Sequence, residues 1–190
     1  MDNNSSKASE IQSDLQPYVD YMEEAIRLAK QAEDLGEVPI GAVVVRDGEI
    51  IGRGYNRREI DGNPLGHAEL MAISEAAEKL GGWRLEQCQL IVTLEPCPMC
   101  AGAIIQARIQ LLIYGAKDPK AGYAGSLYNT LQDQRLNHQT EIIHGVCQEE
   151  CQELLQSFFR RLRAQKKEHK AQMSSQYRES GTGSDSPIES

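Results

Sequence analysis

Long apolar runs are absent from the chain. It contains no stretch of 18 or more apolar residues, which is the length that marks a membrane-spanning helix. Its first six residues, Met1 to Ser6, also lack the basic region and the apolar region of a secretory signal. These two absences predict a protein that neither spans a membrane nor carries an export signal. We therefore expect a cytoplasmic location.

Cysteine is scarce, and the cysteines do not form an even set. There are five, two of which stand in the unit Cys97-Pro98-Met99-Cys100. A small secreted protein that relies on disulfides would have more cysteines and an even number of them. The count favours a reducing compartment with thiolates that bind a metal ion.

An excess of positive charge is also missing. The chain has 20 Lys and Arg against 28 Asp and Glu, a net charge of −8, which argues against a protein that binds nucleic acid over its whole surface. The segment 160–170 is different, because it carries six Lys or Arg and one Glu. Such a stripe can bind phosphates in an acidic protein, and it can equally be the solvated face of a helix. The charge pattern leaves both interpretations open.

The periodicity of apolar residues predicts one α/β domain with a mixed sheet. The pair Asp47-Gly48 predicts a tight turn between the first two strands. Residues 1–16 and 171–190 have no apolar periodicity and are expected to be disordered on either side of a domain at 17–170. A long loop, partly helical near 127–131, is expected over 115–139. The expected helices are 18–35, 66–80, 98–107 and 149–170, and the expected strands are 40–45, 50–55, 89–94, 110–114 and 141–144.

Two short fragments carry side chains suited to chemistry. They are His67-Ala68-Glu69 and the unit that ends in Cys97-Pro98-Met99-Cys100. Pro98 is well placed at the first position of a helix, because its missing N–H has no helical partner there. Cys97 then precedes the helix and Cys100 follows one turn later, at an end where the helix dipole favours thiolates. His67 likewise stands at the start of its predicted helix.

One histidine and two cysteines form a ligand set for zinc that is one ligand short of a tetrahedron. A catalytic site keeps this fourth position open for water, whose pKa the metal lowers to about 7. Glu69 is then placed to move protons between that water and a substrate. A structural zinc site is the alternative, and it would need another protein ligand. The candidates for that ligand are Cys88, His144, Cys147 and Cys151.

The two fragments resemble the signature of zinc-dependent nucleobase deaminases. The similarity to the bacterial tRNA-specific adenosine deaminases extends from about Tyr18 to about Arg163. It implies a cytidine deaminase-like fold, a three-layer α/β/α arrangement with a five-stranded mixed sheet, and a homodimer. It also implies that His67, Cys97 and Cys100 bind one zinc ion per subunit, and that Glu69 is the proton shuttle. The matching segments are Glu37–Val45, Gly54–Arg57, Val92–Ala103, Gly115–Asp118, Ala124–Leu127, Leu136–His138 and Leu154–Arg160.

The same resemblance implies a set of RNA contacts. Asn56 matches an asparagine that hydrogen-bonds the flipped base, although asparagine is also a common turn residue. Asp118 matches an acid that contacts the nucleotide sugar, although an acid before Pro119 can also open a turn. Phe158 and Phe159 match an aromatic pair near the anticodon loop, followed by Arg160 at the start of the basic segment. Adjacent aromatic residues cannot both face a core, so one should be available for stacking.

The resemblance predicts hydrolytic deamination of adenosine to inosine at the wobble position (34) of a tRNA anticodon. The expected partner is a tRNA anticodon stem-loop, and the expected activity is of the EC 3.5.4 type. A small-molecule deaminase acting on guanine or a cytosine derivative is the first alternative, because such enzymes share both zinc fragments. The segment Phe158–Arg160 with its basic continuation argues against it. A non-catalytic zinc module, either RNA-binding or structural, is the second alternative, and Glu69 argues against it.

Overall fold

The computed structural model describes residues 15–180, with side-chain surroundings through residue 173. The chain divides into two compact units, with the boundary between Leu155 and Gln156. The predicted disorder of residues 1–16 and 171–190 falls partly outside the described residues. Where the structure does describe that predicted tail, residues 171–180 are helical. No glycine or proline interrupts the chain between 148 and 180, so nothing in this stretch ends the helix early.

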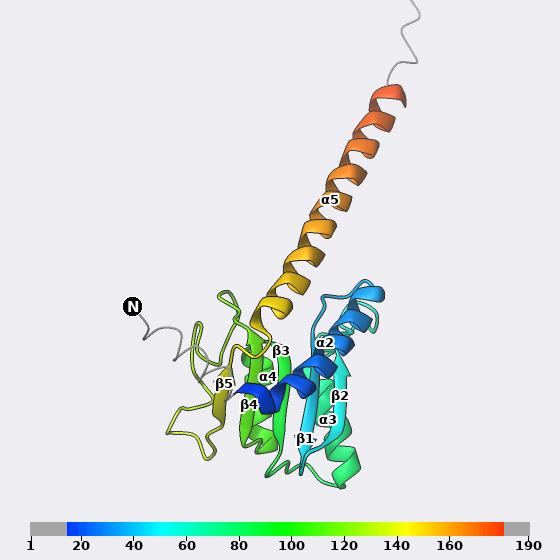
Figure 1. The fold of residues 1–190 in the computed structure, drawn as a ribbon. Coiled ribbons are helices and arrows are strands. Elements are labelled where there is room, and N and C mark those ends of the chain that lie inside the picture. The colour runs from blue at the N-terminus through cyan, green and yellow to red at the C-terminus, as the bar shows by residue number, and fades with distance from the viewer. Residues whose placement is uncertain (1–14, 181–190) are drawn as a thin grey trace, which may run out of the picture. The chain divides into compact units, whose positions relative to one another are not determined.

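A five-stranded mixed sheet forms the centre of the first unit, as expected (Figure 1). Its strand order is β2-β1-β3-β4-β5, with antiparallel pairing on either side of β1 and parallel pairing of β4 with β3 and β5. The predicted turn between β1 and β2 is confirmed, because Asp47 and Gly48 both have positive φ angles. The strands are β1 (Gly41–Arg46), β2 (Glu49–Tyr55), β3 (Gln89–Leu94), β4 (Leu111–Ala116) and β5 (Glu141–His144).

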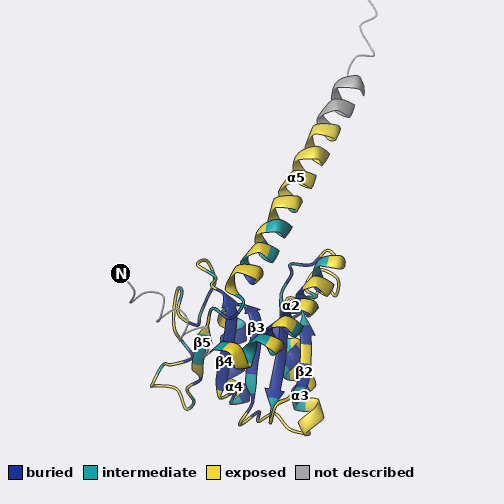
Figure 2. Cartoon of the chain, viewed as in Figure 1, coloured by how far each residue is buried: buried dark blue, intermediate teal, exposed yellow. Residues whose placement is uncertain are grey.

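Helices cover both faces of the sheet, which confirms the three-layer arrangement. Alternate residues of each strand point to opposite faces, so Val44 packs with α3 and α4 while Val43 packs with α2 and the first turns of α5. Figure 2 shows that β1, β3 and β4 are mostly buried, whereas β5 is not. The helices are η1 (Gln16–Tyr18, a short 3-10 helix), α2 (Val19–Asp34), α3 (Ala68–Leu80), α4 (Pro98–Ala107) and α5 (Gln148–Ser180). None of the described helices is long and apolar enough to cross a membrane.

Close packing of α3 on β2 brings the functional side chains to one end of the strands. A Cβ atom at Gly54 would collide with the backbone carbonyl of Ala68, so only glycine allows the strand to lie so close to the start of α3. The C-terminal end of β3 leads directly into α4 through Glu95 and Pro96. The start of α3 and the start of α4 are thus both fixed by the sheet.

The loop between β4 and β5 differs from its prediction. Residues 127–131 are not helical; an isolated bridge joins Ala124 to Asn129 instead. The physical reason is a buried side chain elsewhere in the chain. Glu95 accepts backbone N–H bonds from Ala124 and Ser126, and this draws the loop away from helical geometry.

Candidate metal and catalytic site

The two helix starts bring the three predicted metal ligands together. His67 is the N-cap of α3, Cys97 is the N-cap of α4, and Pro98 occupies the first turn of α4 as expected. The Nδ1 atom of His67 lies 3.7 Å from the Cys97 sulfur and 3.5 Å from the Cys100 sulfur. The ligand atoms of all three residues lie within 4.8 Å of one another. This group is placed to bind a metal ion.

The two thiols and the imidazole strongly perturb one another's pKa values. Hydrogen bonds from Cys100 and His67 stabilise the Cys97 thiolate and lower the pKa of Cys97 to about 4. The hydrogen bond that the Cys100 thiol donates to Cys97, together with burial, raises the pKa of Cys100. The bond to Cys97 also raises the pKa of His67. The protein therefore holds at least one sulfur as a thiolate, the form that binds metals.

Glu69 lies in the first turn of α3, two residues after His67, and is only 4% exposed. Burial raises the pKa of its carboxyl group to about 7, because removal from water disfavours the charged form. A group with a pKa near neutrality can both accept and deliver protons at physiological pH. The arrangement can therefore combine a metal ion with a general acid and base.

The alternative of a closed structural zinc site finds no support among the described residues. Only His67, Cys97 and Cys100 form a group of metal-binding geometry there. Cys88 and Cys151 are buried in the two hydrophobic cores, the latter with its sulfur 4.0 Å from that of Met22. Cys151 thus packs as a small apolar residue rather than as a metal ligand.

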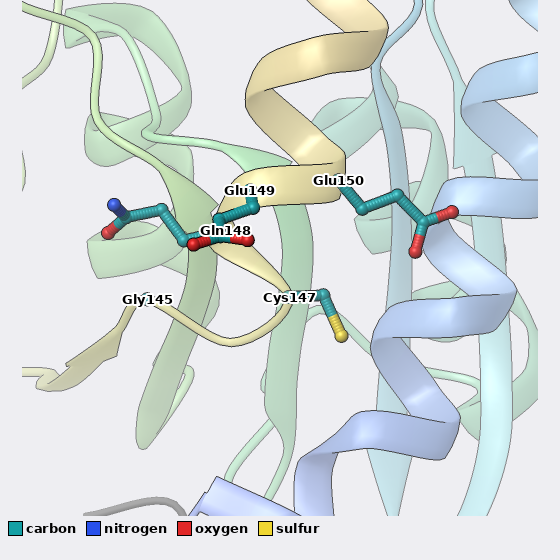
Figure 3. Close-up of a pocket in the computed structure, with 5 residues that line it drawn as sticks. All are labelled: Gly145, Cys147, Gln148, Glu149 and Glu150. Carbon is teal, nitrogen blue, oxygen red and sulfur yellow. The ribbon is translucent and has the colours of Figure 1, made fainter. Parts of the chain in front are cut away.

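A separate pocket of about 590 Å³ opens beside the start of α5 (Figure 3). It is lined by Gly145, Cys147, Gln148, Glu149 and Glu150. Of these, only Cys147 was considered in the sequence analysis, as a candidate ligand of a structural zinc site. The Glu150 carboxylate forms an exposed ion pair with Lys30 across 3.3 Å. Burial raises the pKa of Cys147, which makes its thiol less reactive. This pocket is not the candidate site.

The expected RNA contacts are distributed over both units. Asn56 is buried directly after β2. Asp118 accepts backbone N–H bonds from Lys120 and Ala121 through Oδ1, which is the role of a residue that opens a turn. Phe158 and Phe159 lie on α5 in the second unit. Their rings meet edge to face with centroids 5.4 Å apart. Phe159 is 40% exposed, and Arg160 next to it is exposed.

Two buried acids near the site were missed by the sequence analysis. Glu37 is 1% exposed and Glu95 is 2% exposed. Both lie within segments that resemble the deaminases, yet neither was assigned a role. A charged residue inside a domain needs hydrogen-bond partners. The position of Glu37 and Glu95 beside apolar strands is therefore the only signal that could have identified them.

Comparison with known proteins agrees with this fold and site. Residues 18–163 match the MafB19-like deaminase family. A tRNA-specific adenosine deaminase of Bacillus subtilis (strain 168) is 55% identical over 77% of this chain and 91% of its own length. Another from Haemophilus influenzae is 44% identical over 81% of this chain and 90% of its own.

Solved structures give the same result. A structure from a study of A-to-I editing by tRNA:A34 deaminases at the wobble position of transfer RNA has a TM-score of 0.69 and 43% identity. It covers 71% of this chain and 98% of its own. A guanine deaminase from Bacillus subtilis has a TM-score of 0.51 and 40% identity over 55% of this chain and 68% of its own.

The fold and the group of His67, Cys97 and Cys100 beside Glu69 define the class as a deaminase. Within that class, the chain belongs to the family of tRNA-specific adenosine deaminases.

Proposed function

We propose that this protein hydrolyses adenosine to inosine at the wobble position (34) of a tRNA anticodon. The observation that carries this proposal is a His-Cys-Cys metal group beside a buried acid, in a chain 55% identical to a tRNA-specific adenosine deaminase. The likeness to a structure studied for A-to-I editing of tRNA supports the same substrate. The guanine deaminase covers a smaller share of this chain, with a lower TM-score.

Zinc is the metal that fits the site. One imidazole nitrogen and two sulfurs are its preferred ligands, and three protein ligands leave a position for water, as in catalytic zinc sites. The start of α4 supplies the positive end of a helix dipole beside the thiolates. We infer that His67, Cys97 and Cys100 hold one zinc ion per subunit. When bound, the ion lowers the pKa of water and so supplies a nucleophile at neutral pH.

Glu69 performs the proton transfers in this mechanism. Its pKa near 7 allows the carboxylate to take a proton from the attacking water and to deliver it to N1 of the adenine. The same carboxylate then takes the proton of the new hydroxyl group on C6 and delivers it to the amine, which leaves as ammonia while the oxygen stays on the ring. Because Glu69 is buried, these protons do not exchange with bulk water.

The remaining predicted residues bind the RNA in this proposal. A base in an anticodon loop can leave its stack and enter a buried pocket, whereas a paired base cannot do so cheaply. Asn56 contacts the flipped base, and Asp118 contacts the sugar in addition to forming its turn. Phe158, Phe159 and Arg160 bind the surrounding loop by stacking and by phosphate contact.

We also propose that the protein is a cytoplasmic homodimer. Three large apolar side chains around the loop that leads to His67 are solvent-exposed, namely Ile60 (46%), Leu65 (55%) and Met71 (37%). A second subunit would cover this apolar surface. Sedimentation of the purified protein tests the dimer, and a monomer at micromolar concentration would contradict it.

The direct test of the function is to incubate the purified zinc-loaded protein with tRNA and to sequence the product. We expect adenosine at position 34 to be read as guanosine, as inosine is, with the other adenosines unchanged. The Glu69→Ala variant is the control for contaminating activity. An unmodified position 34 after complete zinc loading would contradict the proposal.

A further inference from the structure

Glu37 is a buried acid whose hydrogen bonds all come from N–H groups. It lies between α2 and β1 and is 1% exposed. Its Oε2 atom accepts a bond from Asn56 Nδ2 at 2.9 Å. Its Oε1 atom accepts the backbone N–H groups of Glu59 at 2.7 Å and Ile60 at 2.8 Å. The two oxygens therefore have separate partners, one a side chain and the other a loop.

This contact determines which way the Asn56 amide points. A carboxylate only accepts hydrogen bonds, so Asn56 must turn its NH₂ group toward Glu37 and its oxygen, Oδ1, away. Within residues 15–173, the Asn56 Oδ1 atom forms no hydrogen bond, whereas every fully buried side-chain oxygen or nitrogen has a partner. Asn56 as a residue is only 6% exposed. Its Oδ1 atom is thus not fully buried, and it is left to accept a bond from a ligand.

Asn56 itself lies next to the segment that leads to the metal group. The backbone N–H of Arg57 donates to the carbonyl of Gly66 at 2.8 Å. Gly66 directly precedes His67, and α3 with Glu69 follows. The backbone N–H of Asn56 donates to Ile40 at 3.0 Å. Asn56 is therefore held between β1 and the chain that leads to the metal ligand.

We propose that Glu37 is a positioning residue that fixes the Asn56 amide with Oδ1 directed at the substrate. This inference rests on the proposed function, in which Asn56 contacts the nucleotide. Oδ1 accepts a hydrogen bond from the reacting nucleotide, whose donors are the amine of the base and the ribose hydroxyl. An acceptor at Oε2 is essential, because it prevents the Asn56 amide from rotating by half a turn.

The variant Glu37→Gln tests this idea with almost no change in shape. The backbone N–H groups of Glu59 and Ile60 require an acceptor at the Oε1 position, so the new NH₂ group must take the place of Oε2. It then faces the NH₂ group of Asn56, and the Asn56 amide rotates and directs a donor at the substrate. The second substitution Asn56→Asp restores the original pattern, because its carboxylate accepts from the new NH₂ group and again directs an oxygen at the substrate.

The experiment measures kcat and KM for an anticodon stem-loop with the zinc-loaded wild type, E37Q, N56D and the double variant. We expect each single variant to lose about 10- to 100-fold in kcat/KM, the scale of a misplaced binding group. The activity of N56D should fall because this variant places two carboxylates, the new one at position 56 and that of Glu37, next to each other. The double variant should recover to within a few-fold of the wild type. Glu78→Gln, which changes an exposed glutamate of α3, is the matched control and should behave as the wild type.

A double variant no more active than the weaker single variant would overturn the inference, as would full activity of E37Q. If instead the wild type fails to act on the stem-loop, the proposed function fails. Should E37Q not fold, the ¹⁵N-labelled wild type provides the test. Its Asn56 side-chain signals should shift when an unreactive stem-loop binds, and unmoved signals would overturn the inference.

A stem-loop with 2′-deoxyadenosine at the reacting position identifies the donor. If Oδ1 accepts the ribose hydroxyl, the deoxy substrate should be slow with the wild type and insensitive to E37Q. If Oδ1 accepts the base amine, E37Q should lower activity on both substrates equally. Either pattern supports the contact, whereas a deoxy substrate that E37Q accelerates would overturn it.

Discussion

Glu69 combines burial, a pKa raised to about 7 and a place two residues after a metal ligand. We expect Glu69→Ala to fold, to retain its metal and to lose about 100- to 10,000-fold in kcat, the usual effect of removing a general acid or base. Single-turnover kinetics on a stem-loop measures this loss. Activity near that of the wild type would show that another group carries the protons.

Cys100 has a different role from Glu69, and its removal should have a different result. The variant Cys100→Ala deletes one of three ligands, so we expect zinc content to fall well below one ion per chain, and activity to fall with it. Metal analysis after gel filtration measures this. Cys147→Ala is the matched control, because Cys147 lies outside the metal group, and it should retain its full zinc content. Equal zinc in both variants would contradict the ligand assignment.

Residue spacing was enough to predict the metal group but not the buried acids around it. His67, Cys97 and Cys100 could be inferred because helix starts place such residues predictably. Glu37 and Glu95 bind backbone N–H groups 22 to 31 residues away along the chain. No local pattern encodes partners at such a separation, and a glutamate beside a strand looks like a surface residue.

At the scale of elements, Glu95 connects the end of β3 to the loop after β4. Its carboxylate accepts N–H bonds from Asp118 at 3.0 Å, Ala124 at 3.1 Å and Ser126 at 2.9 Å, and it also accepts a bond from the Ser126 hydroxyl. Both oxygens thus need to be acceptors. We expect Glu95→Gln to leave N–H groups unsatisfied and to lower the free energy of unfolding by about 1–3 kcal/mol.

Urea denaturation of the Glu95→Gln variant measures this loss of free energy. Backbone hydrogen exchange in the variant should become faster in residues 118–126 before it does so in the strands. Glu86→Gln, which changes an exposed glutamate, is the matched control and should leave both measurements unchanged. Unaltered exchange in the loop of the Glu95 variant would contradict the role of Glu95 in holding it.

The second unit carries the basic stripe of α5, which consists of the exposed residues Arg160, Arg161, Arg163, Lys166 and Lys167. If these side chains contact phosphates, reversing their charge should raise KM for a stem-loop by about tenfold or more at low salt, with little change in kcat. The control is to reverse Lys79 and Arg84, which are exposed outside α5. An equal effect of both changes would indicate general electrostatics rather than a binding stripe.

Elements with local signals were predicted well, and those shaped by distant contacts were not. The β1–β2 turn was predicted because Asp-Gly favours the positive φ angles found there. The end of α5 was placed ten residues too early, because polar composition suggested disorder although the stretch lacks helix breakers. The loop after β4 was misjudged because Glu95, from another part of the chain, determines its path.

At the scale of the whole molecule, the family similarity spans residues 18–163 and so includes both the metal group and the start of the basic stripe. A deaminase that acts on a free base has no use for a stripe that binds phosphates. An enzyme that acts on a loop of RNA needs both the metal group and the basic stripe. The choice of substrate therefore depends on whether these two features act together.

The measurement that tests this most directly compares turnover of an anticodon stem-loop with turnover of free adenosine, guanine and cytidine by the zinc-loaded protein. It is carried out at two salt concentrations, about 50 and about 200 mM. We expect the stem-loop to have a kcat/KM that exceeds that of every free compound by orders of magnitude and that falls steeply with salt. Comparable or faster turnover of any free base or nucleoside would contradict the assignment to tRNA and identify a small-molecule deaminase.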